Sequence, residues 1–183
     1  MNLADFTLTS FEQMLGTFDH MLAKAEADPR GEALIGEKLS DDMYPLATQV
    51  RFTTHQVVNT LNRLTGSTLP TQDSDHATIT DARAHIAETR DMIKNARPEA
   101  FVADNTPVSF DLPNGMAFEM SAVEYVRDWS LPQFYFHLMP ADSIRREAGI
   151  ALGKAALAPR DEPAPASLPP DLIKAILAAR PRA

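Results

Sequence analysis

His137 is the residue of this sequence best placed to do chemistry, because it directly follows three aromatic residues, Phe134 to Phe136. An imidazole in such a setting could bind a transition metal or carry a proton. A metal such as zinc, nickel or manganese needs three or more ligands around one centre. On a helix through His137, the adjacent turns hold Gln133 and Ala141, and neither supplies a second imidazole. The pattern favours a core histidine held by hydrogen bonds to protein groups, with a metal ligand as the alternative.

The other histidines form no recognisable ligand set. His20, His76 and His85 lie at scattered positions without the spacing of metal ligands. His55 falls on the face of its predicted helix opposite the apolar residues, so we expect it to point away from His137. We therefore expect no cofactor. The alternative is one divalent transition metal bound by His137 with ligands other than histidine.

A small-molecule pocket is a second hypothesis for the same stretch of chain. Its candidate residues are Tyr125, Trp129, Gln133, Tyr135 and His137. Side chains with apolar bodies and polar tips suit such a pocket, and the interior of a helix bundle can hold one. Aromatic residues are also common in ordinary core and interface packing, and we favour that interpretation.

An acid–base pair is the third hypothesis, because Glu124 and Asp128 are one helical turn apart. Paired carboxylates can have pKa values that differ enough for acid–base catalysis. Acidic residues are also favoured near the start of any helix, and we prefer that explanation. The chain has no G-x-S-x-G motif and no glycine-rich phosphate loop, so nucleophilic catalysis has little support.

Apolar residues at three- and four-residue spacing predict four long helices. Their approximate ranges are Thr9 to Ala27, Asp42 to Thr65, Thr80 to Pro98, and Ser121 to Gly149. Capping boxes at Thr9 with Glu12 and at Ser121 with Glu124 predict the first and fourth starts, and Gly66 is expected to end the second helix. Within the fourth helix, Pro132 is placed to begin a second segment and Pro140 should introduce a kink.

Between the third and fourth helices the spacing of apolar residues changes to alternation. Apolar residues alternate on both sides of Asn114 and Gly115, which predicts a β-hairpin within Thr106 to Met120. The long polar link from Gly66 to Thr78 permits a crossover, with the second and third helices parallel and the fourth antiparallel to both. The predicted fold is therefore an all-α four-helix bundle with this crossover and a small hairpin before the fourth helix.

Arg145 is predicted to point inward, which is unusual for a charged residue. In the bundle just described, the start of the second helix lies near the end of the fourth. We therefore expect Asp41 or Asp42 to form a structural ion pair with Arg145.

Composition limits the function further. The 183 residues carry a net charge of −8, which argues against a nucleic-acid partner. There is no cysteine, no signal peptide and no apolar run long enough to span a membrane, so we expect a cytoplasmic protein without a membrane partner. We expect the bundle domain to occupy residues 1–157, followed by a proline-rich linker and a short docking helix over residues 158–183.

Two blocks of sequence support a family resemblance. The first runs from Leu39 to Leu46 (LSDDMYPL), continues with Gln49 and Val50, and ends with Arg63 to Gly66 (RLTG). The second is Phe134 to His137 (FYFH) with Ile144, Arg145 and Gly149 to Lys154 (GIALGK). Over roughly Met1 to Leu157 the chain resembles a bacterial domain-of-unknown-function family, which looks like a branch of the DinB/YfiT-like metalloenzyme superfamily.

The resemblance implies a DinB-like bundle that forms a homodimer. Better-known members of the superfamily bind a divalent metal through one histidine on the second helix and a pair, one turn apart, on the fourth, and some are thiol-dependent transferases. This chain departs from that pattern, with Gln133 and Ala141 beside His137. We therefore expect a non-catalytic small-molecule-binding or interaction protein with a degenerate metal site. The alternatives are a metal-dependent, thiol transferase-like enzyme using His137 with non-histidine ligands, and a homodimeric assembly module.

Overall fold

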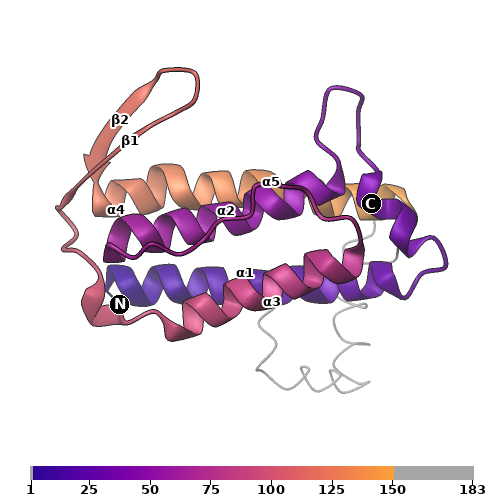
Figure 1. Cartoon of the computed structure of the whole chain (residues 1–183), viewed down its shortest axis with the longest axis horizontal. Helices are drawn as coiled ribbons and strands as arrows, with labels where there is room; N and C mark the ends of the chain where they lie inside the picture. Colours follow the sequence, from indigo (N-terminus) through magenta and orange to yellow (C-terminus); the bar gives the residue numbers. More distant parts are fainter. Residues whose placement is uncertain (1, 151–183) are drawn as a thin grey trace, which may run out of the picture.

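The predicted helical stretches fold as helices in the computed structural model, which describes residues 2–150 (Figure 1). The long helices are α1 (Leu3–Glu26), α2 (Leu46–Thr65), α3 (Ile79–Asn95) and α5 (Leu131–Glu147). Short helical segments are η1 (Gly31–Gly36), η2 (Pro98–Ala100), α4 (Ala122–Glu124) and η3 (Tyr125–Ser130). None of the described helices is both long enough and apolar enough to cross a membrane. The predicted proline-rich linker and docking helix, residues 158–183, lie outside the described residues.

The first helix begins six residues earlier than predicted. The side-chain oxygen of Asn2 accepts a hydrogen bond from the Asp5 amide at 2.8 Å and so caps α1. The predicted capping box at Thr9 and Glu12 is therefore wrong, because both residues lie inside this helix. An N-cap asparagine satisfies the same orphan amide as a serine or threonine.

The second helix begins four residues later than predicted, at Leu46. Pro45 precedes it in an extended conformation, and a proline disfavours helical geometry in the residue before it. Asp41 and Asp42 therefore lie in an exposed loop instead of the first helical turn. Gly66 ends this helix in the left-handed conformation, with φ of 67°, as predicted.

The link between α2 and α3 is a crossover that runs back along α2. Asn62, near the end of α2, exchanges hydrogen bonds with the backbone of Leu69. Asp75 accepts hydrogen bonds from Thr48 and Arg51, near the start of α2. The link thus returns the chain to the end where α2 began, so α2 and α3 run parallel and α5 runs antiparallel to both (Figure 1).

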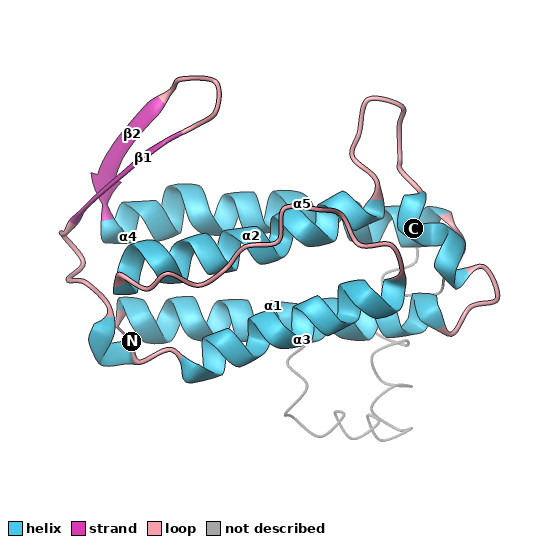
Figure 2. Ribbon diagram, viewed as in Figure 1, coloured by secondary structure: helices cyan, strands magenta, loops and turns pink. Residues whose placement is uncertain are grey.

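The predicted hairpin projects from one end of the bundle (Figure 2). Strands β1 (Pro107–Asp111) and β2 (Ala117–Ser121) pair antiparallel, with Val108 opposite Met120 and Phe110 opposite Phe118. Gly115 takes a φ of 85° in the turn between them. An Asn–Gly pair suits such turns because glycine adopts positive φ without steric cost.

A single helical rod follows the hairpin and is built from α4, η3 and α5. Ser121 and Glu124 form the predicted capping box at its start. The turn over Tyr125–Ser130 is π-helical and was not predicted. Pro132 falls in the first turn of α5, as expected, where its missing amide costs no regular helix bond. Pro140 lies inside α5, which continues to Glu147.

Two apolar clusters stabilise the described residues. The main core joins all four long helices, and a smaller one packs the hairpin against the rod and the end of α2. Residues at the heart of the main core include Phe11, Phe18, Val50, Ile86, Phe134 and Leu138. The contact between the rings of Phe11 and Phe134, with centroids 5.1 Å apart, joins α1 to α5.

Candidate functional site

His137 lies on the face of α5 that packs against α2, and its residue surface is only 8% exposed. Its Nδ1 is 3.0 Å from Oε1 of Gln49 on α2. The amide nitrogen of Gln49 donates to the backbone carbonyl of Tyr44, which turns the amide oxygen towards the histidine. An amide oxygen can only accept, so Nδ1 of His137 carries the proton in this bond. The prediction that protein groups hold this imidazole is confirmed by this contact.

Aromatic side chains enclose the same imidazole. The ring centroid of Phe52 is 4.9 Å from that of His137, and the centroid of Phe136 is 5.3 Å away. Burial lowers the pKa of His137 to about 4. The ring is therefore neutral near pH 7, because desolvation penalises the charged form.

The residues around His137 do not fit the metal site of the better-known DinB-like proteins. Gln133 and Ala141 occupy the adjacent turns, and Gln49 stands opposite on α2 with its oxygen already used. Within residues 2–150 no three histidine, aspartate or glutamate side chains are grouped so that they could hold one metal ion. An amide oxygen is also a poor substitute for an imidazole with zinc or nickel.

The predicted small-molecule residues are not gathered into one pocket. Tyr125 and Trp129 pack near the hairpin, where the Trp129 ring lies 5.0 Å from Phe110. Twelve residues of helix, about 18 Å of rise, separate Tyr125 from His137. Gln133 is half-buried between them, and Tyr135 is exposed with its ring edge-on to its neighbour Phe134. The three cavities described for this structure have none of the five candidates in their walls.

Tyr125 has a structural environment of its own. It is fully buried, and its hydroxyl accepts a hydrogen bond from Nη1 of Arg63 at 3.1 Å. The guanidinium of Arg63 also lies over the Phe110 ring, 4.7 Å from its centroid. These contacts connect the end of α2 to the hairpin and to η3, which supports the packing interpretation.

Arg145 is fully buried as predicted, but its predicted partners are wrong. Asp41 lies beside Lys38 and Asp42 accepts a hydrogen bond from Ser40, both on the exposed loop before α2. The acidic partner of Arg145 is Asp142, on the preceding turn of α5, at 3.2 Å. The late start of α2 explains the error, because it leaves both loop aspartates in solvent.

Three groups surround the buried guanidinium. Nε of Arg145 donates to the backbone carbonyl of Ala141, and Nη2 contacts the sulfur of Met21 as well as Asp142. Nη1 has no hydrogen-bond partner within the described residues. Burial lowers the pKa of Arg145 to about 10, so the residue stays charged at pH 7.

The carboxylates of Glu124 and Asp128 are each bound by another residue and are not paired with each other as acid–base catalysis would require. Glu124 accepts hydrogen bonds from the amide and hydroxyl of Ser121, and these bonds lower its pKa. Arg127 binds Asp128 at 2.6 Å and lowers the pKa of that carboxyl. Both carboxylates are ionised and exposed, which supports the helix-terminus explanation.

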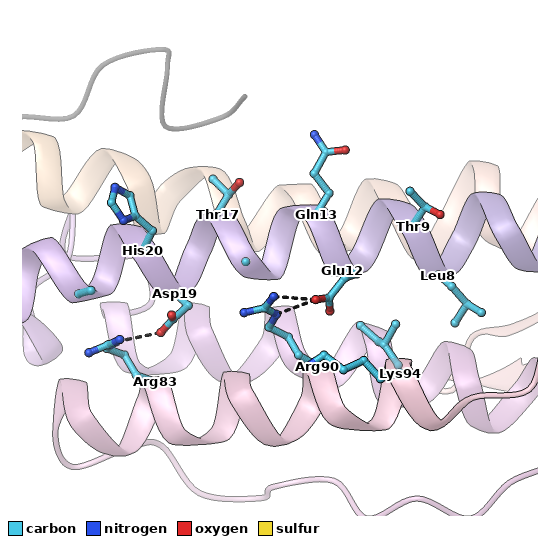
Figure 3. Close-up of a pocket in the computed structure, with 13 residues that line it drawn as sticks. Leu8, Thr9, Glu12, Gln13, Thr17, Asp19, His20, Arg83, Arg90 and Lys94 are labelled. Carbon is cyan, nitrogen blue, oxygen red and sulfur yellow. Dashed lines mark hydrogen bonds and ion pairs between the residues drawn. The ribbon is translucent and has the colours of Figure 1, made fainter. Parts of the chain in front are cut away.

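A groove of about 730 Å³ runs along α1 and α3 (Figure 3). Two arginines of α3 cross it to acidic residues of α1. Arg90 binds Glu12 at 2.6 Å, and Arg83 binds Asp19 at 2.8 Å and also Glu26. These ion pairs join α1 to α3 across the groove. Because the arginines are paired within the protein, they are not available to an anionic ligand.

Sequence reasoning missed a second pair of buried polar side chains. His76, at the end of the crossover, and His85, on α3, are in contact, with Nε2 of one 2.9 Å from Nδ1 of the other. The scattered sequence positions of these histidines gave no indication of this contact. Gln49 was also missed as the partner of His137. Each contact joins two different elements. The partners are nine residues apart for His76 and His85 and 88 residues apart for Gln49 and His137, and neither separation reflects the periodicity of a helix or a strand.

Comparison with known proteins agrees with this fold. The family described as "Domain of unknown function (DUF1993)" matches residues 3–157. Among solved structures, the chain is similar to a DinB family member protein from Shewanella denitrificans. The TM-score is 0.78 at 26% sequence identity, over 89% of this chain and 96% of that one. No curated protein matches the sequence. The chain belongs to the DUF1993 family of domains of unknown function, and its bundle is DinB-like.

Proposed function

We propose that this protein is a non-catalytic, self-associating bundle whose α2–α5 surface binds a second copy of the chain. Four rings form what we call the aromatic row: Tyr44, Phe52, His137 and Phe136. Consecutive ring centroids along this row lie 5.3, 4.9 and 5.3 Å apart. The row therefore runs without interruption from the loop before α2 to the outer side of α5.

The exposure of this row is the observation that carries the proposal. Tyr44 is 56% exposed and Phe136 is 67% exposed. Met139, one turn after Phe136 on α5, is 45% exposed, and Tyr135 is exposed beside it. Large apolar side chains gathered on one surface mark interaction sites more often than they mark solvent-facing positions.

The chemistry of His137 supports a binding role over a catalytic one. Its Nδ1 proton is committed to Gln49, and no carboxylate within the described residues hydrogen-bonds to the ring. A general acid or base works best with a pKa near the operating pH, whereas the pKa of His137 is lowered to about 4. The ring therefore serves as a packed element beneath the exposed members of the row.

A second copy of this chain is the occupant that we favour. The family resemblance implies a homodimer, and a two-fold axis beside α5 would place Phe136 of each copy near the aromatic row of the other. In such an interface, each of these side chains is buried in both copies of the chain. Each aromatic ring removed from water contributes about 1.5–3 kcal/mol before the entropic cost of association.

Sedimentation velocity tests the proposal on untagged wild-type protein and on two matched variants. Phe136→Ser removes the most exposed ring of the row, and Val123→Ser removes an exposed apolar side chain beside the hairpin. The wild type and Val123→Ser should sediment as dimers, and Phe136→Ser should dissociate at least about tenfold more readily. A monomeric wild type, or a Phe136→Ser variant that dimerises like the wild type, would overturn the proposal.

Metal analysis separates this proposal from the enzymatic alternative. A metal-dependent transferase centred on His137 requires about one tightly held ion per chain that is lost in His137→Ala and kept in His85→Gln. Under our proposal, no ion depends on His137. Elemental analysis of protein purified without an affinity tag distinguishes the two outcomes.

A further inference from the structure

His76 and His85 form a buried imidazole pair between the crossover and α3. The two residues are only 6% and 8% exposed. Nε2 of His76 lies 2.9 Å from Nδ1 of His85, and the ring planes are inclined by 38°. The remaining nitrogen of His76 is buried beside the backbone of Ala47. Two imidazoles are thus held out of solvent in direct contact with each other.

Both rings are neutral near pH 7, which is the form that binds metals. Burial is the main cause that lowers the pKa of His76. A backbone hydrogen bond at Ala47 and the Asp75 and Asp81 carboxylates raise it. Burial, the neighbouring His76 and the more distant His55 lower the pKa of His85 to about 4. Each neutral ring has one N–H and one lone pair, and in the contact one ring donates its N–H to the lone pair of the other.

The pair faces a cavity that contains oxygen donors. This cavity measures about 320 Å³, and its walls include both histidines together with Asp81, Glu88 and Gln72. Asp81 precedes His85 by one turn of α3 and so lies on the same side of that helix. Within the described residues no ion pair holds the side chain of Asp81, whereas Asp75 in the same wall is bonded to Thr48 and Arg51.

We propose that His76 and His85 bind a divalent transition metal of the imidazole-preferring class, such as zinc, nickel or copper, with Asp81 and water as further ligands. Two nitrogens bound to one ion at about 2.0–2.1 Å lie roughly 2.9–3.4 Å apart for bond angles of about 90–109°. The separation of 2.9 Å in this structure falls at the lower end of that range. The ion would take the place of the proton that now lies between the two rings. That proton would move to the other nitrogen of its own ring, so that both rings stay neutral and each offers a lone pair to the ion.

Movement of Asp81 completes the site. Residues 2–150 hold no third histidine or carboxylate already in a ligand position, so the ion must recruit one. Asp81 is exposed and lies in the cavity wall, so a change of rotamer suffices. The site is independent of His137, because it is built from the crossover and α3, whereas His137 lies on α5 against α2.

Metal binding would fasten the crossover to α3. The crossover is otherwise held to α2 by hydrogen bonds from Asn62, Thr48 and Arg51. An ion that binds the folded state and not the unfolded one raises the melting temperature, and the stabilisation grows with the logarithm of its concentration divided by its dissociation constant. The site would therefore act as a structural clamp, with a thermal shift as its direct readout.

Cobalt(II) absorption and zinc calorimetry on untagged protein at pH 7.5 test this site. We expect one equivalent to bind the wild type, with binding at least about 30-fold weaker in His85→Gln and about 3–10-fold weaker in Asp81→Asn. His137→Gln is the matched control, because it removes another buried histidine, and it should bind like the wild type. Zinc should raise the melting temperature of the wild type and of His137→Gln, and not that of His85→Gln.

A second variant guards against loss of folding. His76→Gln removes the other imidazole from the crossover instead of from α3, and circular dichroism without metal establishes which variant is folded. The proposal is overturned if the folded wild type binds no ion up to about 1 mM, an affinity of only about 4 kcal/mol. It is equally overturned if the folded His76→Gln or His85→Gln protein binds zinc as the wild type does.

Discussion

Nδ1 of His137 donates a hydrogen bond to Oε1 of Gln49 across the α2–α5 interface, over 3.0 Å. The residues are 88 positions apart in sequence, and the bond joins the two helices directly. The same Gln49 amide donates to the Tyr44 carbonyl, so the pair is fixed from the loop before α2 as well. The contact therefore connects the loop before α2, α2 itself and α5 through protein groups.

Replacement of Gln49 by leucine should destabilise the protein. Leucine is similar in size but cannot accept the Nδ1 proton, which leaves a buried imidazole N–H unsatisfied. The expected loss in the free energy of unfolding is about 1–3 kcal/mol, measured by urea denaturation at pH 7. Gln56→Leu, two turns further along α2 and half-buried, is the control and should change stability by less than about 0.5 kcal/mol.

Acidification should destabilise the fold partly through His137. Its pKa is about 4 in the folded protein and near 6.5 ordinarily, so the unfolded chain binds the proton more readily between these values. The stability due to the neutral ring is complete above pH 6.5 and is lost as the pH falls towards 4. Wild-type stability should drop about 1–3 kcal/mol more than that of His137→Gln between pH 7 and pH 4.5. Parallel curves for the two proteins would contradict this account.

Asp142, not a loop aspartate, should be the acidic residue on which Arg145 depends. Asp142 is buried and binds Arg145 at 3.2 Å and Arg146 at 2.7 Å. Asp142→Ala leaves the buried guanidinium of Arg145 without a counter-charge, which costs about 3–5 kcal/mol. Asp41→Ala, on the exposed loop, should cost no more than about 0.5 kcal/mol. Equal effects of Asp142→Ala and Asp41→Ala on the melting temperature would contradict the assignment of Asp142 as the partner of Arg145.

Local patterns in the sequence were sufficient to predict several elements. Asn114 and Gly115 fix a turn by their own backbone preferences, and the alternating residues on each side then pair as strands. Ser121 and Glu124 cap each other within one turn, so their box needs no distant partner. The crossover was predicted from the length of the polar link and from the lengths of the helices that this link joins.

The errors arose where a local pattern competed with a non-local one. Thr9 and Glu12 have the spacing of a capping box, yet Asn2 caps a longer helix in which they are interior residues. Arg145 was predicted to be buried from periodicity, but periodicity does not select among nearby acids, and Asp142 lies closer along the helix. The partners of His137 and His85 are chosen by helix packing, which no spacing rule in the sequence describes.

The glycine that ends α2 should be required for its conformation. Gly66 has a φ of 67°, where a Cβ atom costs about 1–2 kcal/mol. Gly66→Ala should therefore lower the free energy of unfolding by about 1 kcal/mol, as measured by denaturant titration. Gly36→Ala is the matched control, because Gly36 does not have positive φ and a Cβ there meets no atom within 4 Å. A Gly66→Ala protein as stable as Gly36→Ala would show that the turn relaxes.

The protonation of His137, observed by long-range ¹H–¹⁵N NMR with and without zinc, tests the central claim most directly. We predict a neutral ring with its proton on Nδ1 from pH 8 down to about pH 5, and imidazole resonances that do not move when zinc is added, even if those of His76 and His85 do. A ring protonated on Nε2, a pKa near 6.5, or a zinc-dependent shift at His137 would contradict the account.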